Sequence, residues 1–248
     1  MKNLHRLIVH SATYRQSSRV TPALLEKDAY NRLLARSPRL RVDAEGVQDI
    51  ALRVSGLLSP KIGGPSVFPV LPEGVMSLSY GPIPWNVSEG DDRYRRAMYT
   101  FWKRSVPYPA LVTFDAPTAE QSCVRRMRSN TPLQALVTLN EPTFNQAARW
   151  LGYRALAEGG KDDDARLAFA FRVCTARQPD AKELKALRSL LSDARSEFTG
   201  SAKDAATVAF ADPKNPVPLP AGANTADLAA WTAVSRALLN LDETITKE

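Results

Sequence analysis

The sequence predicts a mainly α fold: a multi-helix domain with one long Pro/Gly-rich excursion and at most a small β element. Three observations support this prediction. Apolar residues recur at helical spacing through much of the chain, residues typical of helix starts precede several of these segments, and Pro and Gly cluster in two stretches. The chain has 248 residues, 44% of them hydrophobic, which suffices for the buried core of a single domain.

The first half contains three expected helices and one long loop. Leu4, Leu7 and Ile8 follow the helical period, and Thr21-Pro22 is a typical cap followed by Pro at the first helical position. The expected helices are residues 2–15, a segment after Pro22, and about 42–58. Residues 59–92 hold too many Pro and Gly residues for a long regular element, so we expect a loop there. The aromatic-rich stretch 97–102 is a short strand candidate.

The second half is expected to be helical, with one interruption. Thr131-Pro132 opens a helix, and Pro142 breaks or kinks it before a further helix continues. Asp180 and Glu183 have the spacing of a capping box. The remaining expected segments are a helix over 163–175, a helix from Asp180 through Leu191, a Pro-rich insertion of extended character over 199–224, and a terminal helix over 225–242.

Composition and charge narrow the class of protein. The apolar content excludes disorder of the whole chain, and no apolar run reaches the roughly 18–20 residues of a membrane span. The N-terminus also lacks the layout of a signal peptide. The net charge of +7 comes from two segments: 1–41 has nine basic and two acidic residues, and 93–128 has eight and two. These segments either form an electropositive face that attracts polyanions or pair with the acidic segment 42–92.

The two cysteines give no metal or haem signature. Cys123 and Cys174 lie far apart in the sequence, without CxxC, CxxCH or zinc-ligand spacing, so we expect no metal site and no cofactor in this chain. They either form one disulfide, as in an exported protein, or remain two unpaired hydrophobic side chains.

Several motifs occur together in a fixed order over residues 4–197. They are Leu4-His5-Arg6-Leu7-Ile8, Ser11-Ala12-Thr13-Tyr14-Arg15-Gln16-Ser17-Ser18, Gly63-Gly64-Pro65-Ser66-Val67, Phe114-Asp115-Ala116-Pro117, Thr131-Pro132-Leu133-Gln134-Ala135-Leu136 and Leu139-Asn140 followed by Pro142. This set resembles the planctomycete-type domain of unknown function 1553 (DUF1553). Members of that family have a further stretch of the domain before the first motif, so the resemblance implies that 1–248 is a single but partial domain.

The resemblance also implies a setting for the chain. The family domain is typically the C-terminal part of large exported proteins, periplasmic or on the cell surface. These proteins often carry c-type haem on a separate cytochrome-like segment, together with a companion domain, and they often lie beside proteins that handle polysaccharides. The resemblance assigns no reaction and no catalytic residue.

One helix groups two carboxylates with two arginines. Arg41, Glu45, Asp49 and Arg53 follow each other at four-residue spacing, so they share a face of the expected helix. They form surface ion pairs, a buried polar network that holds this helix against the basic 93–128 segment, or an acid/base pair. Glu45 and Asp49 are therefore weak catalytic candidates. His5 is a third, although a structural hydrogen bond is the alternative for it.

Basic and aromatic residues alternate in the 93–128 segment. This chemistry suits an anionic polymer or a sugar, because guanidinium groups bind anions and flat rings stack. The alternative is an aromatic strand with solvated or paired arginines. The candidate binding residues are Arg95, Arg96, Lys103, Arg104, Arg125, Arg126, Trp102 and Tyr99.

From these observations we expect a non-catalytic accessory or interaction domain of an exported, cytochrome-linked multidomain protein. Its partner would be an anionic polysaccharide or the companion domain. The first alternative is an enzyme acting on polysaccharide or on a redox substrate. The second is a nucleic-acid-binding protein, although no binding motif accompanies the charge.

Overall fold

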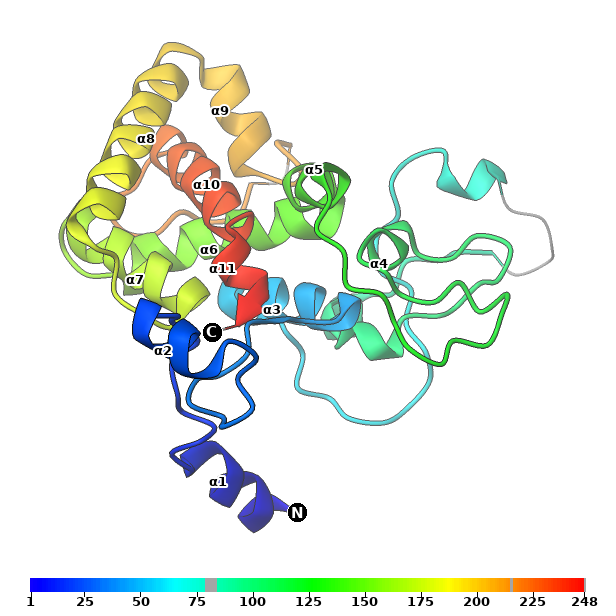
Figure 1. The fold of residues 1–248 in the computed structure, drawn as a ribbon. Coiled ribbons are helices and arrows are strands. Elements are labelled where there is room, and N and C mark those ends of the chain that lie inside the picture. Colours follow the sequence, from blue (N-terminus) through cyan, green and yellow to red (C-terminus); the bar gives the residue numbers. More distant parts are fainter. Residues whose placement is uncertain (79–83, 215, 248) are drawn as a thin grey trace. The chain divides into compact units, whose positions relative to one another are not determined.

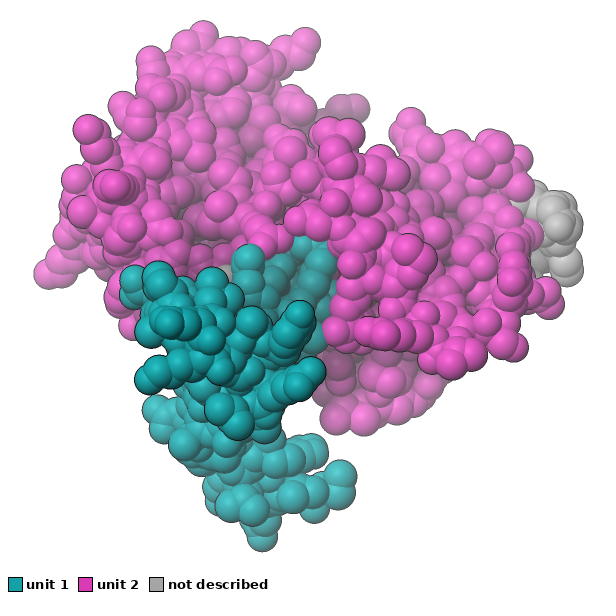
Figure 2. All heavy atoms as spheres, in the orientation of Figure 1, with its two compact units in different colours: residues 1–42, 245–248 teal, residues 43–244 magenta. Residues whose placement is uncertain are grey.

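The computed structural model describes residues 1–78, 84–214 and 216–247, and the prediction of a mainly α fold is confirmed (Figure 1). The chain divides into two compact units, residues 1–42 with 245–248 and residues 43–244, which Figure 2 colours separately. No helix in the described part of the chain is long and apolar enough to cross a membrane.

The smaller unit holds two short helices and a two-stranded antiparallel sheet. They are α1 (Lys2–His10), α2 (Pro22–Asp28), β1 (Leu40–Arg41) and β2 (Thr246–Lys247). The helix expected over 2–15 ends early, because Ser11 adopts an extended conformation. The start of α2 agrees with the sequence: the Thr21 hydroxyl accepts a hydrogen bond from the Leu24 N–H, and Pro22 is the first helical residue.

The larger unit contains the main core. Its elements are α3 (Ala44–Ser55), η1 (Val75–Leu78), η2 (Gly90–Tyr94), η3 (Ala97–Tyr99), α4 (Pro109–Thr113), α5 (Pro132–Asn140), α6 (Pro142–Glu158), α7 (Asp163–Thr175), α8 (Ala181–Gly200), α9 (Ala202–Ala209), α10 (Thr225–Leu239) and α11 (Asp242–Ile245). Helix α10 packs against α6, α8 and α9, while α3 packs on another part of α6. Trp231, Val234 and Leu238 of α10 are completely buried.

Several expected helix boundaries match because local capping chemistry determines them. Asp180 and Glu183 form the expected capping box at the start of α8. Pro142 separates α5 from α6, and Glu141 accepts hydrogen bonds from the first N–H groups of α6. Helix α7 has the predicted bounds.

The strand expected over 97–102 is wrong. Residues 97–99 form the single 3₁₀ turn η3, and Val67 and Thr100 form one isolated parallel bridge. The Val67 N–H donates to the Tyr99 carbonyl at 2.8 Å, and the Phe101 N–H donates to the Val67 carbonyl at 2.8 Å. The aromatic residues are therefore explained by packing on the 59–92 loop, where the Phe68 and Phe101 rings stack 4.9 Å apart.

The two Pro-rich segments are more ordered than expected. The 59–92 loop contains η1 and η2, and residues 79–83 of it lie outside the described residues. The segment 199–224 was expected to be extended, but it includes α9, which Ser201 caps by accepting from the Asp204 N–H. Residue 215 lies outside the described residues. The terminal helix expected over 225–242 ends at Leu239, and α11 follows.

The contact between α6 and α10 predicts the effect of one substitution. A Cβ at Gly152 would lie 2.9 Å from the Trp231 carbonyl carbon and 3.0 Å from the Thr232 nitrogen. Both atoms are backbone, so α10 would have to move. We expect Gly152→Ala to lower the free energy of unfolding by about 1–3 kcal/mol in urea denaturation. Gly200→Ala is the control, because a Cβ there meets no atom within 4 Å, and equal stability of the two variants would contradict the prediction.

Candidate binding site on the arginine loop

A loop of residues 116–128, which we call the arginine loop, is tied together at its base. The Ser129 N–H donates to Asp115 Oδ2 at 2.7 Å, and the Ser129 hydroxyl donates to Asp115 Oδ1 at 3.0 Å. Gln134 Nε2 adds hydrogen bonds to Ser129 Oγ and to the Thr113 carbonyl, each at 3.0 Å. The two ends of the loop are therefore held by buried or half-buried polar side chains.

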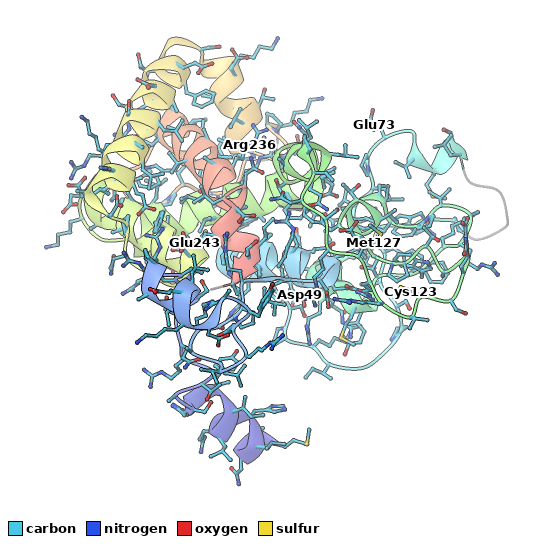
Figure 3. All side chains as sticks on the ribbon, in the orientation of Figure 1. Asp49, Glu73, Cys123, Met127, Arg236 and Glu243 are labelled. Carbon is cyan, nitrogen blue, oxygen red and sulfur yellow. The ribbon has the colours of Figure 1, made fainter. Side chains whose placement is uncertain are left out.

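The C-terminal end of the arginine loop is bound to the start of α3. Arg126 makes a two-pronged ion pair with Glu45, at 2.6 and 3.0 Å, and Arg128 pairs with Asp43 at 3.3 Å. One turn further along α3, Asp49 accepts from Arg96 Nε at 2.8 Å; this carboxylate is labelled in Figure 3. Ion pairs therefore join α3 to the 93–128 segment, but the network is not buried as that alternative supposed, because the Arg96, Arg126 and Arg128 side chains are 54%, 38% and 46% exposed.

These contacts indicate that the two carboxylates, Glu45 and Asp49, have a structural role. Partial burial raises the pKa of Glu45, but its hydrogen bonds with Arg126 and with its own backbone N–H and the charge of Arg126 lower it more, so the pKa lies below its ordinary value. Asp49 accepts a second hydrogen bond from the Ala97 N–H at 2.7 Å. Both carboxylates thus act as anchors for neighbouring segments. Arg41 of the expected ladder lies in β1, before the helix begins.

Two of the expected binding residues are buried. Arg95 is only 2% exposed and Lys103 only 7%. The Arg95 guanidinium donates to the Pro65 carbonyl at 3.1 Å and to the Gly63 carbonyl, and it lies 3.9 Å from the centre of the Tyr99 ring. The Tyr99 hydroxyl in turn accepts from the Gly63 N–H at 2.8 Å. Arg95 and Tyr99 therefore fix the 61–65 turn and do not face a ligand.

The remaining expected residues form a partly neutralised basic surface. Arg104 and Arg125 are exposed, and no ion pair involves them among the residues that the structure describes. The 125–128 stretch and Asp43 line an open hollow of about 640 Å³. Trp102 supports the loop, since its Nε1 donates to the Thr118 carbonyl at 3.1 Å. The structure thus brings Arg96, Arg125, Arg126 and Trp102 to one region through α3 and the loop.

The histidine and cysteine candidates lie elsewhere or stay unpaired. His5 is exposed on α1 in the smaller unit. Cys123 and Cys174 are both free, the first exposed and the second buried, so the disulfide considered above is not formed. Within the described ranges, no group of three or more His, Cys, Asp and Glu side chains is arranged to hold a metal ion.

Sequence reasoning missed a buried acid at the start of α6. Glu141 is 7% exposed and accepts from the Thr143 N–H at 2.8 Å and from the Tyr108 hydroxyl at 2.7 Å. Burial raises the pKa of Glu141 although these hydrogen bonds oppose it, and burial next to Glu141 raises the pKa of Tyr108 well above its usual value. The signal in the sequence was the acid directly before Pro142, which is the position of a helix cap.

A second missed feature is a polar and aromatic face of α6. Gln146, Arg149, Trp150 and Tyr153 recur at the helical period and line a hollow of about 240 Å³ together with Tyr94. The helical spacing of these residues was visible in the sequence. They lie on the face opposite the buried stripe of α6, where the spacing alone does not indicate a site. Only the fold shows that this face is hollowed.

Comparison with family models gives a match over most of the chain. Residues 1–191 match the family model PSD1, described as a protein of unknown function (DUF1553). No curated protein and no solved structure matches the chain.

The buried position of Arg95 leads to a stability prediction. Arg95→Met removes the donors of several carbonyl groups and the contact with Tyr99, so we expect the free energy of unfolding to fall by roughly 2–5 kcal/mol. Arg104→Met removes an exposed arginine of the same segment and should change the free energy of unfolding by less than about 0.5 kcal/mol. Urea denaturation of the two variants measures both values, and similar small losses would show that Arg95 is not structural.

The lowered pKa of Glu45 predicts a pH dependence. A carboxylate with a lowered pKa stabilises the fold above its unfolded pKa, and this stabilisation is lost as the pH falls through the folded value. We expect Glu45→Gln to cost on the order of 0.5–1 kcal/mol at pH 7 and almost nothing near pH 3. Chemical denaturation at several pH values measures the difference, with Glu197→Gln on the exposed face of α8 as the control. A pH-independent difference would contradict the ion-pair explanation.

Proposed function

The chain belongs to the DUF1553 (PSD1) family of proteins of unknown function, and on this premise we propose that it is a non-catalytic accessory domain that binds an anionic polysaccharide. The observation that carries this proposal is the arginine loop. It presents Arg125 without an acidic partner among the described residues, beside Arg126 and Arg128, around an open hollow. Guanidinium groups bind carboxylates and sulfates in a two-pronged geometry, which suits a polymer that carries these groups.

The tethered shape of the loop also favours binding. The hydrogen bonds of Asp115 fix the base of the loop, and the ion pairs with α3 restrain it further. A preorganised loop loses less conformational entropy when it binds than a mobile one. The paired arginines keep donors for a ligand, because exposed ion pairs are weak and exchange partners readily.

An enzymatic function has less support. General acid/base catalysis needs two groups in different environments, one of them protonated at the working pH. Glu45 and Asp49 are instead both bound to arginines on the same face of α3. The buried Glu141 is absent from the linings described for the hollows of about 670, 640 and 240 Å³, and it already accepts hydrogen bonds from the first N–H groups of α6.

Docking to the companion domain is a second candidate function. Val124 and Met127, which flank the arginines, are strongly exposed, and Figure 3 labels Met127 and Cys123 on the loop. Met and Arg are enriched in protein interfaces, where apolar contacts accompany ionic ones. The family also suggests that the chain works outside the cytoplasm and that haem is carried on another domain, and we include both in the proposal.

The proposal is tested by binding to polygalacturonate in about 50 mM salt. We expect Arg125→Gln/Arg128→Gln to weaken binding about tenfold, because each exposed ionic contact contributes roughly 0.5–1 kcal/mol. The matched control is Arg172→Gln/Lys185→Gln, which removes the same charge from exposed positions of α7 and α8. Binding of the unmodified chain should also weaken as salt is added.

Further probes separate the alternatives. Poly-L-glutamate represents an acidic protein surface, and duplex DNA represents nucleic acid. Preference for poly-L-glutamate that depends on Val124 and Met127 would favour docking to a protein. Preference for DNA would favour nucleic-acid binding. Equal binding of the two double variants, or no binding of polygalacturonate, would overturn the polysaccharide proposal.

A further inference from the structure

A hollow on the outer face of α6 combines aromatic and polar side chains. Its lining includes four side chains on one face of α6, Gln146, Arg149, Trp150 and Tyr153, and the ring of Tyr94 from η2. The Trp150 and Tyr153 rings are 5.3 Å apart and inclined by 50°. Such rings offer flat apolar surfaces with polar edges, which is the environment that a ring-shaped polar ligand needs.

The polar groups of the hollow are held in place. Gln146 Nε2 donates to the Tyr94 hydroxyl at 2.5 Å, which joins α6 to η2. Arg149 Nε donates to the Val208 carbonyl at 2.8 Å, near the end of α9. A site with fixed donors binds without reorganisation, so the arrangement is suited to recognition of a small molecule.

Arg149 is a half-buried cation without an acidic partner. Its side chain is bonded to carbonyl groups, and no carboxylate pairs with it within residues 1–78, 84–214 and 216–247. Burial lowers the pKa of Arg149, and the charge of Arg236 lowers it further. Arg236 on α10, labelled in Figure 3, donates to the Leu139 carbonyl at 2.6 Å, and its buried Nε has no partner among the described atoms.

Two neighbouring guanidinium groups that form no ion pair with a described carboxylate are unfavourable in a partly desolvated place. A bound anion would supply the missing charge and would gain more from it there than at an exposed site. The arginines that line the hollow between α7 and α8 differ in this respect. Arg188 and Arg195, which line the hollow between α7 and α8, are paired with Asp164, Asp163 and Asp227.

We propose that this hollow binds one acidic sugar residue, a pyranose that carries a carboxylate or a sulfate ester. The anionic group meets Arg149, the ring lies against Trp150 and Tyr153, and sugar hydroxyls bind Gln146 and the carboxylate of Asp212. Asp212 also lines the hollow, where its Oδ1 accepts from the Lys214 N–H at 2.9 Å. The inference rests on the proposed function for the choice of a sugar, while the anionic character comes from Arg149.

The size of the hollow supports a single residue. Its volume of about 240 Å³ lies below the roughly 300–1,000 Å³ of pockets for drug-sized ligands. It therefore holds one ring, with the rest of a chain left outside. The arginine loop and this hollow would then recognise different features of one polymer: the loop its charge density, and the hollow an individual acidic unit.

The test uses D-glucuronate, D-galacturonate and galactose 6-sulfate, with glucose and galactose as neutral matched controls. The readout is the NMR signal of the Trp150 indole N–H, assigned through Trp150→Phe. We expect at least one acidic sugar to shift this signal and to bind at least tenfold more tightly than its neutral counterpart. Arg149→Gln should weaken that binding at least tenfold, whereas Arg172→Gln, which removes an exposed arginine from α7, should leave it unchanged.

A second variant is needed because Arg149 also bonds the end of α9, so that Arg149→Gln could lose binding by misfolding. Tyr153→Leu removes the flat ring but no charge. We therefore expect it to weaken the binding of acidic and neutral sugars by the same factor. The inference is overturned if acidic and neutral sugars bind equally to the unmodified chain, or if Arg149→Gln and Tyr153→Leu both bind as the unmodified chain does.

Failure of this inference can be distinguished from failure of the proposed function. Sugar binding at Trp150 without polygalacturonate binding at the arginine loop would refute that function and support the hollow. Polymer binding that depends on Arg125 and Arg128 but not on Arg149 would do the reverse.

Discussion

The burial of α10 is the constraint on which the larger unit depends. Its residues contact α6, α8 and α9, and Trp231, Val234 and Leu238 are removed from water completely. Gly152 permits this, because a side chain there would collide with the backbone of α10. Because the buried stripe of α6 packs against α10, the opposite face of α6, which carries Arg149 and Trp150, is accessible to solvent and ligands.

The second organising interaction is electrostatic and joins segments that are distant in the sequence. The α3 carboxylates attach both the arginine loop and the start of η3 to one helix face. Individually such exposed pairs contribute little free energy. Their combined effect is positional: they hold a loop of little regular structure over a helix that is itself packed on α6. Some basic residues of the 93–128 segment thus hold other segments in place, and only the remainder form a basic surface.

The sequence was informative where local chemistry decides the outcome. Thr21, Asp180 and Pro142 marked helix starts correctly, since a cap or a proline acts within one turn. It failed where the partner is remote. The burial of Arg95 depends on carbonyl groups of the 61–65 turn, about thirty positions earlier, and the hollow at Arg149 needs a segment that follows α9. Charge patterning identified the carboxylates of α3 but left open which arginines they bind.

The position of α10 in the sequence has a consequence for biosynthesis. Helix α6 leaves the ribosome well before α10, which at typical translation rates of 5–20 residues per second is synthesised roughly 3–13 s later. During that interval α6 lacks its contacts with α10, although α3, which also packs on it, has already been synthesised. The apolar surface of α6 that α10 covers in the folded chain is therefore exposed for longer when translation is slow.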